Sequence, residues 1–186
     1  MTVRISKPEF NLREKLTELD YGQVPYEKMP VGSVVQVKKD QLYGSGQVNT
    51  TSNSYQDSGL FIDFYPKFAS SRLIIELQFN ASTGSASASG VEWTVYRQID
   101  GTATSSSFNV MGSSDLGRNI SYTSPSGYMH ESGASTILDD KPQTIKKVQY
   151  RLFFRSHNGS TSVGVARNWG GSHIKVTEVR EWGILI

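Results

Sequence analysis

The chain has 186 residues, 19 Lys and Arg against 17 Asp and Glu, a formal net charge of +2, and no cysteine. This length supports one well-buried domain with a short appendage, rather than two independent cores. The basic residues are scattered instead of clustered, which argues against a nucleic-acid interface, and without cysteine neither disulfides nor cysteine-ligated zinc can stabilise the fold.

The opening MTVRISKPEFNLREK has no apolar core of the signal-peptide kind. No run of about 18 apolar residues, the length that a membrane-spanning helix needs, occurs anywhere in the sequence. We therefore expect no signal peptide, no membrane span and a protein that is made in the cytoplasm.

The stretch SKPEFNLREKLTELDYG, residues 6–22, predicts the one helix of the chain. Ser6 and Glu9 form a capping box at its start. Pro8 suits the first turn, and Gly22 can end the helix in the left-handed conformation. Both ends of the predicted helix are therefore marked in the sequence.

Four apolar residues before and within this helix follow a narrow coiled-coil-like seam: Ile5, Leu12, Leu16 and Leu19. A helix this short is marginal in water, so the seam needs a partner surface, in its own domain or in another subunit. Residues 21–33, with two prolines and two glycines, predict an extended linker. We interpret residues 1–32 as an attachment helix and linker, and residues 33–186 as a β domain.

From residue 33 onward, apolar residues recur at every second position, the pattern of half-buried antiparallel strands. The clearest segments are residues 33–38, 59–66, 71–80, 91–98, 146–156, 161–166 and 172–179. Stretches rich in Gly, Ser, Asn and Pro separate them, and Asn158-Gly159 is the strongest two-residue hairpin signal. The pattern predicts a mainly β protein, an antiparallel β-sandwich of roughly eight to ten strands of jelly-roll or Greek-key type, with a closed barrel as the alternative.

Metal-binding chemistry is not indicated by the sequence. The three histidines are isolated from one another: His130, His157 and His173. Zinc sites need closely spaced ligands, so we expect these histidines to be exposed or hydrogen-bonded beside loops. Asp139 and Asp140 form the closest carboxylate pair, and they fit a solvated turn before Pro142 better than a calcium site. We predict no metal and no cofactor.

Catalytic chemistry is equally sparse. No Gly-x-Ser-x-Gly motif is present. Four glutamates lie on or near predicted strands, but no spacing places two of them across a cleft as glycoside cleavage requires: Glu76, Glu92, Glu131 and Glu178. We therefore predict that the protein is not an enzyme.

Two aromatic or apolar features stand apart from the predicted core. Trp169, which two glycines follow, is the best candidate for stacking on a sugar, whereas Trp93, Tyr150 and Phe154 fall on the apolar side of strands and predict core packing. The last residues, REWGILI, carry apolar side chains that need cover in a final strand or an intersubunit contact: Trp182, Ile184 and Ile186.

Two parts of the sequence resemble a known group of proteins. The segment ISKPEFNLREKLTELDY resembles the short N-terminal segment of virion appendage and tail-fibre-associated proteins of marine short-tailed bacteriophages, cyanophages in particular. The stretches YMHESGASTILDD, VQYRLFFRSHNGSTSVGVAR and GGSHIKVTEV resemble their β-rich C-terminal region, with a Ser-x-Ile-x-Val-x-Glu strand at residues 172–178. REWGILI continues past the usual end of that pattern.

The resemblance implies a structural protein of a phage particle, most often trimeric, without catalytic residues. We therefore expect a homotrimeric virion protein, a tail fibre, knob or capsid decoration. Its N-terminal segment binds other virion proteins of the capsid or tail, and its β domain projects outward, where loops can meet host-surface glycans. A lectin-like module that binds sugar at Trp169 is the alternative, and a polysaccharide depolymerase is a third hypothesis.

Overall fold

The computed structural model of the chain describes residues 28–41, 47–84, 89–112, 117–121, 129–166 and 172–181. The chain divides into two compact units, Met1–Pro30 and Val31–Ile186, and every strand of the described ranges belongs to the second unit. The regular structure within these ranges is β. No helix in the described part of the chain is long and apolar enough to cross a membrane.

Eleven strands run through the described ranges. In chain order they are β1 (Val34–Gln41), β2 (Gln47–Thr50), β3 (Gln56–Phe64), β4 (Arg72–Thr83), β5 (Ser89–Ile99), β6 (Phe108–Asn109), β7 (Gly117–Ser121), β8 (Met129–Asp140), β9 (Val148–Ser156), β10 (Val163–Ala166) and β11 (His173–Val179).

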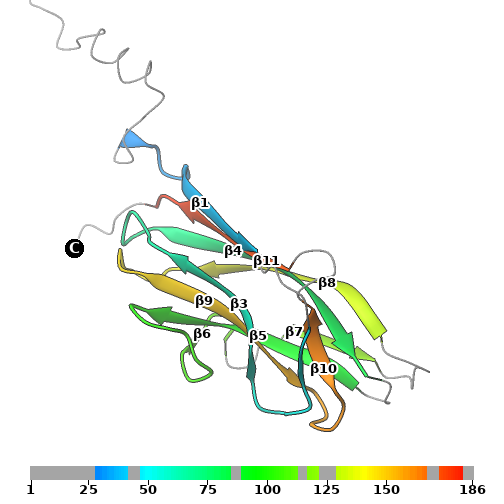
Figure 1. Cartoon of the computed structure of the whole chain (residues 1–186). Helices are drawn as coiled ribbons and strands as arrows, with labels where there is room; N and C mark the ends of the chain where they lie inside the picture. Colours follow the sequence, from blue (N-terminus) through cyan, green and yellow to red (C-terminus); the bar gives the residue numbers. More distant parts are fainter. Residues whose placement is uncertain are drawn as a thin grey trace, which may run out of the picture. The chain divides into compact units, whose positions relative to one another are not determined.

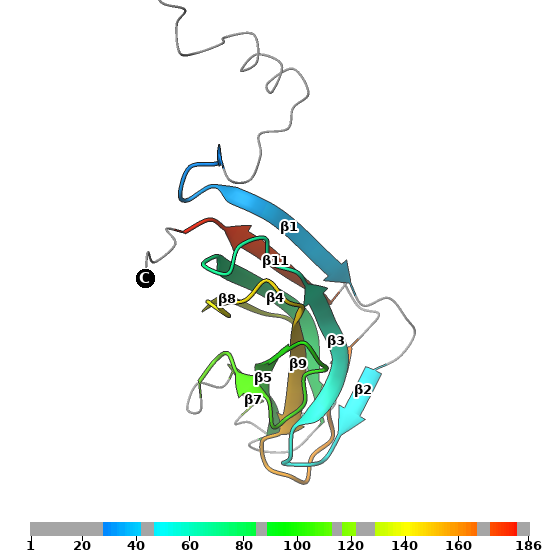
Figure 2. The ribbon, with the colours of Figure 1, turned by 90° about the vertical axis from the view of Figure 1, so that its left-hand side faces the viewer.

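The strands form two antiparallel sheets. The first sheet contains β1, β11, β4, β10 and β2 in that order, with β8 also paired to β4; the second contains β3, β9, β5 and β6, with β7 also paired to β5. Figures 1 and 2 show β1, β11, β4 and β8 side by side, with β9 and β5 neighbours in the other sheet. The mainly β, antiparallel sandwich that the sequence predicts is confirmed.

The central strand of the first sheet is β4. One of its edges pairs with β8 from Leu73 to Thr83. Its other edge pairs first with β11, over residues 72–78, and then with β10, over residues 80–83. A single long strand therefore holds three neighbours in register, so its alternation decides which side chains of the whole sheet face inward.

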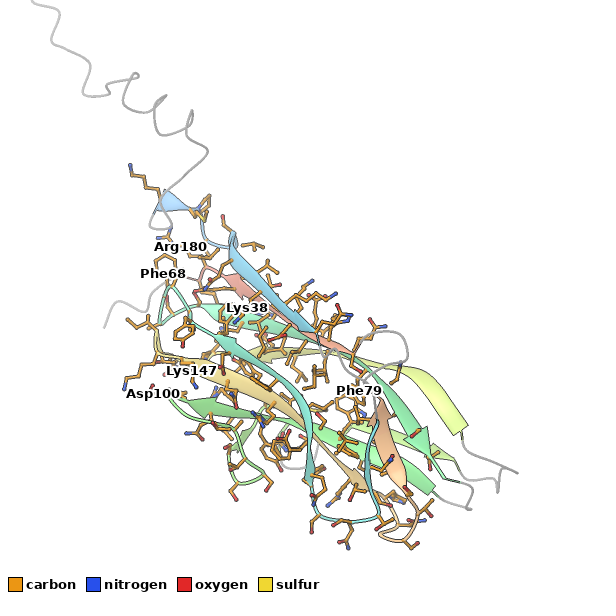
Figure 3. The ribbon with its side chains drawn as sticks, viewed as in Figure 1. Lys38, Phe68, Phe79, Asp100, Lys147 and Arg180 are labelled. Atoms are coloured by element: carbon orange, nitrogen blue, oxygen red, sulfur yellow. The ribbon has the colours of Figure 1, made fainter. Side chains whose placement is uncertain are left out.

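The core lies between the two sheets and follows the alternation of the strands. In β11, inward residues such as Ile174 and Val176 are buried, while the residues between them are half-buried. Phe79 and Trp93 meet edge to face across the core with ring centroids 5.2 Å apart; Figure 3 labels Phe79. The predicted core positions Trp93, Tyr150 and Phe154 are buried, which confirms that part of the sequence analysis.

The central strand of the second sheet, β9, is buried on both faces. Its outward Phe153 packs with Tyr96 and Ala103, and Tyr55 lies against this second cluster. Tyr96 contacts Phe153 and Tyr55 edge-on, at centroid distances of 5.2 and 6.1 Å. Because Ala103 belongs to the loop between β5 and β6, that loop covers part of the sheet's outer surface and excludes water from it.

Four strands were not predicted from the sequence: β2, β6, β7 and β8. The longest of them, β8, reads MHESGASTILDD, in which small and polar residues interrupt any apolar alternation. It forms because it pairs with β4 along its length, a long-range interaction that local pattern does not encode.

Two turn predictions are wrong. The Asn158-Gly159 turn does not close a hairpin, since it connects β9 of the second sheet to β10 of the first. Gly159 does take a left-handed conformation, with φ of 67°, and the Asn158 side chain accepts hydrogen bonds from the backbone N–H of Ser160 and Thr161. Asp139 and Asp140 belong to strand β8 rather than to a solvated turn.

The predicted helix at residues 6–22 lies outside the described residues and stays a prediction. The same holds for the boundary between an attachment segment, residues 1–32, and the β domain, because most of that segment is outside the described part of the chain.

A matched pair of isoleucines tests where the core lies. Ile75 is fully buried and Ile145, in the loop before β9, is 62% exposed. We expect Ile75→Ala to lower the free energy of unfolding by about 2–5 kcal/mol, since it removes buried methyl groups and leaves a cavity. Ile145→Ala should change it by less than about 0.5 kcal/mol in the same urea titration. Equal losses for the two variants would contradict the described core.

Candidate functional site

The residues that the sequence analysis assigned to attachment, oligomer contact or glycan contact all lie outside the described part of the chain. They are Ile5, Leu12, Leu16, Leu19, Trp169, Trp182, Ile184 and Ile186. The structure neither brings them together nor separates them, so their roles stay predictions. The polar groups that it does describe are organised around three carboxylates.

The first carboxylate is Glu178 on β11, which is completely buried. It accepts hydrogen bonds from Ser71 Oγ at 2.6 Å and from Gln36 Nε2 at 2.6 Å. The backbone N–H of Lys67 donates to it at 2.8 Å, and that of Phe68 at 3.2 Å. Both carboxylate oxygens are thus engaged, and Glu178 fixes the turn between β3 and β4 onto the first sheet.

The surroundings of this turn reinforce that anchor. Gln36 Nε2 also donates to the backbone oxygen of Tyr65 at 2.7 Å, and Lys38 Nζ donates to that of Asp63 at 2.7 Å. The Arg180 guanidinium lies 5.3 Å from the ring centroid of Phe68, and Figure 3 places these two residues at the same end of the sandwich. Side chains of β1 thereby link the first sheet to the end of β3.

The second carboxylate is Asp140, at the end of β8. Its Oδ1 lies 2.6 Å from an Arg97 guanidinium nitrogen, and its Oδ2 accepts a hydrogen bond from the Tyr150 hydroxyl at 2.6 Å. Burial of the phenol, with the negative charge of Asp140 adding to it, raises the pKa of Tyr150 far above its usual value. Since Arg97 and Tyr150 belong to the second sheet, this cluster links the two sheets.

The third carboxylate is Glu92 on β5, whose side chain is almost fully buried. Arg155 Nε lies 2.7 Å from one of its oxygens and His157 Nδ1 lies 2.8 Å from the other. The Arg155 guanidinium stacks 4.7 Å from the ring centroid of Tyr55. His157 is therefore hydrogen-bonded beside a loop, as the sequence analysis expected.

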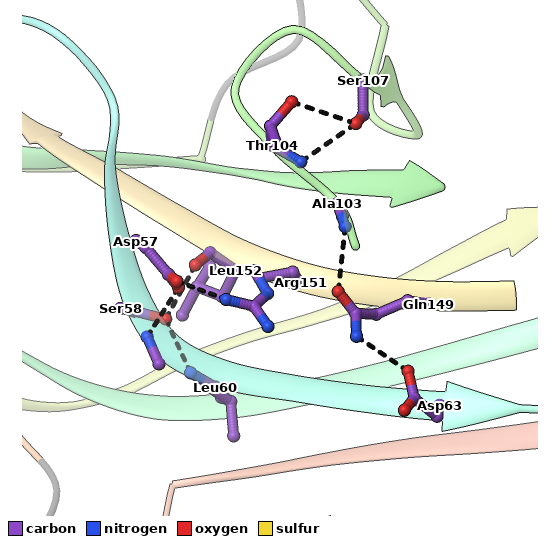
Figure 4. A network of polar contacts seen from close by, with 11 residues as sticks. Asp57, Ser58, Leu60, Asp63, Ala103, Thr104, Ser107, Gln149, Arg151 and Leu152 are labelled. Atoms are coloured by element: carbon purple, nitrogen blue, oxygen red, sulfur yellow. Dashed lines mark hydrogen bonds and ion pairs between the residues drawn. The ribbon is translucent and has the colours of Figure 1, made fainter. Parts of the chain in front are cut away.

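Two residues of β9, Gln149 and Arg151, tie this strand to β3, and Gln149 also ties it to the loop between β5 and β6, as Figure 4 shows. Gln149 bridges them, because its Oε1 accepts from the Ala103 N–H at 2.9 Å and its Nε2 donates to Asp63 at 2.8 Å. Arg151 pairs with Asp57 and lies 4.6 Å from the ring centroid of Phe61. These amide and guanidinium groups serve the fold, since each is held by a neighbouring strand or loop.

The described candidate catalytic glutamates each have different structural partners. Glu92 and Glu178 are held by donors in two different sheets, and Glu76 pairs with Lys175 at the surface. The side chain of Glu131 is outside the described part of the structure. The arrangement offers buried structural anchors rather than an acid and a base facing a substrate.

The candidate calcium ligands point apart as well. Alternation along β8 turns Asp140 inward to Arg97, while Asp139 turns outward to Arg72, with 2.6 Å between the charged atoms. No group of three or more potential metal ligands occurs among the described residues. Sequence reasoning missed Asp140 as an anchor because the long-range pairing of β8 was not visible.

No protein-family model matches the sequence, and the comparison with curated proteins found no match. Among solved structures, the chain is similar to Eiger TNF from S. frugiperda, with 11% identity, a TM-score of 0.46, and coverage of 81% of this chain and 97% of that one. It is also similar to a structure of infectious bursal disease virus Gx strain, with 15% identity, a TM-score of 0.34, and coverage of 78% and 37%.

A third similar structure is the infectious bursal disease virus VP2 subviral particle, with 14% identity, a TM-score of 0.30, and coverage of 77% of this chain and 40% of that one. The chain therefore spans less than half the length of the two viral proteins. At these TM-scores and identities the similarities define no family.

Because Glu178 holds the turn between β3 and β4, weakening its hydrogen bonds should reduce the order of this turn measurably. Glu178→Gln replaces one acceptor oxygen with an NH₂ group that faces donors, so we expect unfolding to become easier by about 1–3 kcal/mol. Trypsin should then cleave after Lys67 faster than in the unchanged protein. Glu181→Gln, which loses the half-exposed ion pair with Lys141, should change stability by less than about 1 kcal/mol. Unaltered cleavage in Glu178→Gln would refute the anchor.

The Tyr150 environment predicts a loss of stability at alkaline pH. A folded-state pKa above the unfolded value near 10 means that the unfolded chain releases its proton first, so stability is full below about pH 10 and falls as pH rises. Above the unfolded-state pKa, the free energy of unfolding falls by about 1.4 kcal/mol for each pH unit because of this one group. Tyr150→Phe should show a shallower decline in urea titrations between about pH 9 and 11.5.

The same variant should be less stable than the original protein at pH 7, since it leaves Asp140 without one donor. Tyr65→Phe, which removes a phenol oxygen from a 59% exposed side chain, serves as the control at pH 7 and should cost less than about 0.5 kcal/mol. An identical alkaline slope with and without the Tyr150 hydroxyl would be inconsistent with this assignment.

Proposed function

We propose that the protein is a non-enzymatic structural protein of a bacteriophage particle. In this proposal it is a homotrimeric appendage, a tail fibre, knob or capsid decoration, anchored by its N-terminal segment. The β-sandwich projects outward, where its loops can meet host-surface glycans.

The strand order carries this proposal. With the short strands β2, β6 and β10 set aside, the sheets read β1-β11-β4-β8 and β3-β9-β5-β7. This is the order expected of a jelly roll, in which two Greek keys wrap a pair of four-stranded sheets, so we infer that type of sandwich. Jelly rolls are common in viral capsid and lectin domains, and that association is an analogy at the level of fold.

The buried carboxylates support the non-enzymatic part of the proposal. Glu178, Asp140 and Glu92 are the most enclosed acidic groups of the described residues, and each has its oxygens matched by donors or cations of the fold. A general acid or base must exchange a proton with a substrate, and groups held in this way stabilise structure instead. What the domain offers to other molecules is therefore its surface.

The anchoring role of the N-terminal segment follows from its sequence. The seam of Leu12, Leu16 and Leu19 needs a partner surface. Sister helices or another virion protein can supply one, and both partners fit a particle protein that attaches by this segment.

Substituting the seam in the full-length chain tests the anchor. We expect Leu12→Asp/Leu16→Asp to lower incorporation into purified particles at least about tenfold, because two charges would replace apolar contacts. Quantitative mass spectrometry of particles measures this effect. Lys15→Asp, which changes a charged position of the same predicted helix, is the control and should be incorporated normally. Normal incorporation of the seam variant would overturn the proposed attachment.

A further inference from the structure

Strand β8 forms one edge of the first sheet and lies beside β4 in Figure 1. Among the described strands it pairs with β4 alone. The backbone groups of an antiparallel strand point alternately to its two sides, so about half of the N–H and C=O groups of β8 point away from β4. We call the side of β8 that faces away from β4 its open edge.

The open edge of β8 lacks the usual protection of an edge strand. Natural edges are blunted by lysine, by proline, by bulges or by short length, because a row of unpaired backbone groups is a template for a further strand. Residues 134–138, ASTIL, carry no charge and no proline. Together with Asp139 and Asp140 they pair with β4 without interruption, since the register shift lies beyond Ala134. This part of β8 is therefore suited to accept a strand.

The opposite edge of the sheet, strand β1, is protected in the expected way. Lys38, Lys39 and Asp40 are consecutive and exposed. The chain that enters β1 also lies beside the end of β11, since Gly32 N donates to Arg180 O at 2.8 Å and Arg180 N donates to Ser33 O at 2.9 Å. The two long edge strands of the first sheet thus differ, and β8 is the open one.

Ile137 shows that the open edge also leaves apolar surface uncovered. This side chain is 72% exposed, the largest value among the large apolar side chains that the structure describes. Its neighbour on β4 is Glu76. A strand added to the open edge would place a second cross-strand neighbour beside Ile137, on the side away from Glu76, and such pairs stabilise a sheet.

The sequence contains a segment that suits this edge. Residues 182–186, WGILI, lie outside the described part of the chain, and four of the five are large apolar residues that need cover. Trp and Ile favour strands, because their side chains fit a half-buried pleated surface. The sequence analysis left a final strand and an intersubunit contact as the two possibilities for this segment.

The described chain approaches β8 at the point where this segment begins. Glu181 is the last residue that the structure describes, and its Oε2 lies 2.7 Å from Lys141 Nζ. Lys141 directly follows β8, whose last residue is Asp140. Residues 182–186 therefore start within side-chain reach of the end of β8.

Strand direction and chain length both permit the segment to reach the open edge. Strands β11 and β8 are each antiparallel to β4 and end level with one another, where Val179 pairs with Arg72 and Asp140 pairs with Leu73. A chain that leaves β11 and turns back along β8 is therefore antiparallel to β8. The crossing from β11 covers three strand spacings, about 14 Å, and the five residue steps from 179 to 184 span about 16 Å.

We propose that residues 184–186 form a short antiparallel strand on the open edge of β8 in the same chain, beside residues 137–139. This strand extends the first sheet and covers Ile137. The inference goes beyond the proposed function and depends neither on the homotrimer nor on the bacteriophage particle.

Hydrogen exchange of the full-length chain, read by mass spectrometry, tests the added strand. Consecutive residues point their N–H groups to opposite sides, so Ile184→Pro/Leu185→Pro removes a donor to β8 in either register. We expect exchange in residues 134–140 to become at least about tenfold faster, since a strand that loses its neighbour opens more easily.

A conservative variant and a second peptide are the controls for this experiment. Ile184→Val/Leu185→Val keeps both N–H groups and the apolar character, so exchange in residues 134–140 should stay as in the original protein. The peptide that covers β1, residues 34–41, should exchange equally in all three proteins, which shows that the sandwich itself is folded.

The absence of native cysteine permits a second readout by disulfide formation. Ile137→Cys is combined in turn with Ile184→Cys, Leu185→Cys and Ile186→Cys, and each chain is oxidised mildly. Opposed residues on antiparallel strands lie about 5 Å apart between Cα atoms, which a disulfide can bridge. We expect one of the three pairs to form a bond within one chain. Val37→Cys on β1 is the control and should form none with the same partners.

Each outcome decides for or against the added strand. Faster exchange in the proline variant together with a disulfide inside one chain supports it. A disulfide from position 137 to a second chain, seen as a covalent dimer on a denaturing gel, overturns the assignment to the same chain. Equal exchange in residues 134–140 for the proline and valine variants, with no more disulfide at position 137 than at position 37, overturns strand addition altogether.

Discussion

A carboxylate removed from water must be matched by donors or cations, and this requirement is met at the points where the sandwich is joined together. Glu178 gathers the turn between β3 and β4 onto β11, Asp140 connects β8 to the second sheet through Arg97 and Tyr150, and Glu92 holds Arg155 and His157 beside the corner after β9. The same acids that looked like candidates for chemistry instead fix the relation between sheets and turns.

The outer surfaces of the two sheets differ in how far the chain itself covers them. The outer surface of the second sheet is partly closed by its own chain, since Tyr55 and the loop around Ala103 cover Tyr96 and Phe153. The outer face of the first sheet has no such cover in the described residues and presents Val37 and Ile137. One sheet therefore has part of its outer surface buried by the domain's own chain, whereas the other presents apolar side chains to solvent within the described residues.

Alternation along the strands was sufficient to predict a mainly β sandwich and to place Trp93, Tyr150 and Phe154 in the core, because a period of two fixes which side of a half-buried strand is apolar. It failed for β8, where MHESGASTILDD carries little alternation and pairing with β4 supplies the stability. It failed for Asn158-Gly159 as well, since a turn signal does not specify whether the next strand returns to the same sheet.

The sequence by itself determined the class of the domain, the lack of cysteine chemistry and the apolar character of the segments around Leu12 and Ile184, because composition and periodicity are local properties. Only the tertiary structure decided which strands are neighbours, why Asp139 and Asp140 face opposite ways, and that Val37, Ile74 and Ile137 share one surface. These residues are far apart in the chain, and hydrogen-bond register between β1, β11, β4 and β8 brings them together.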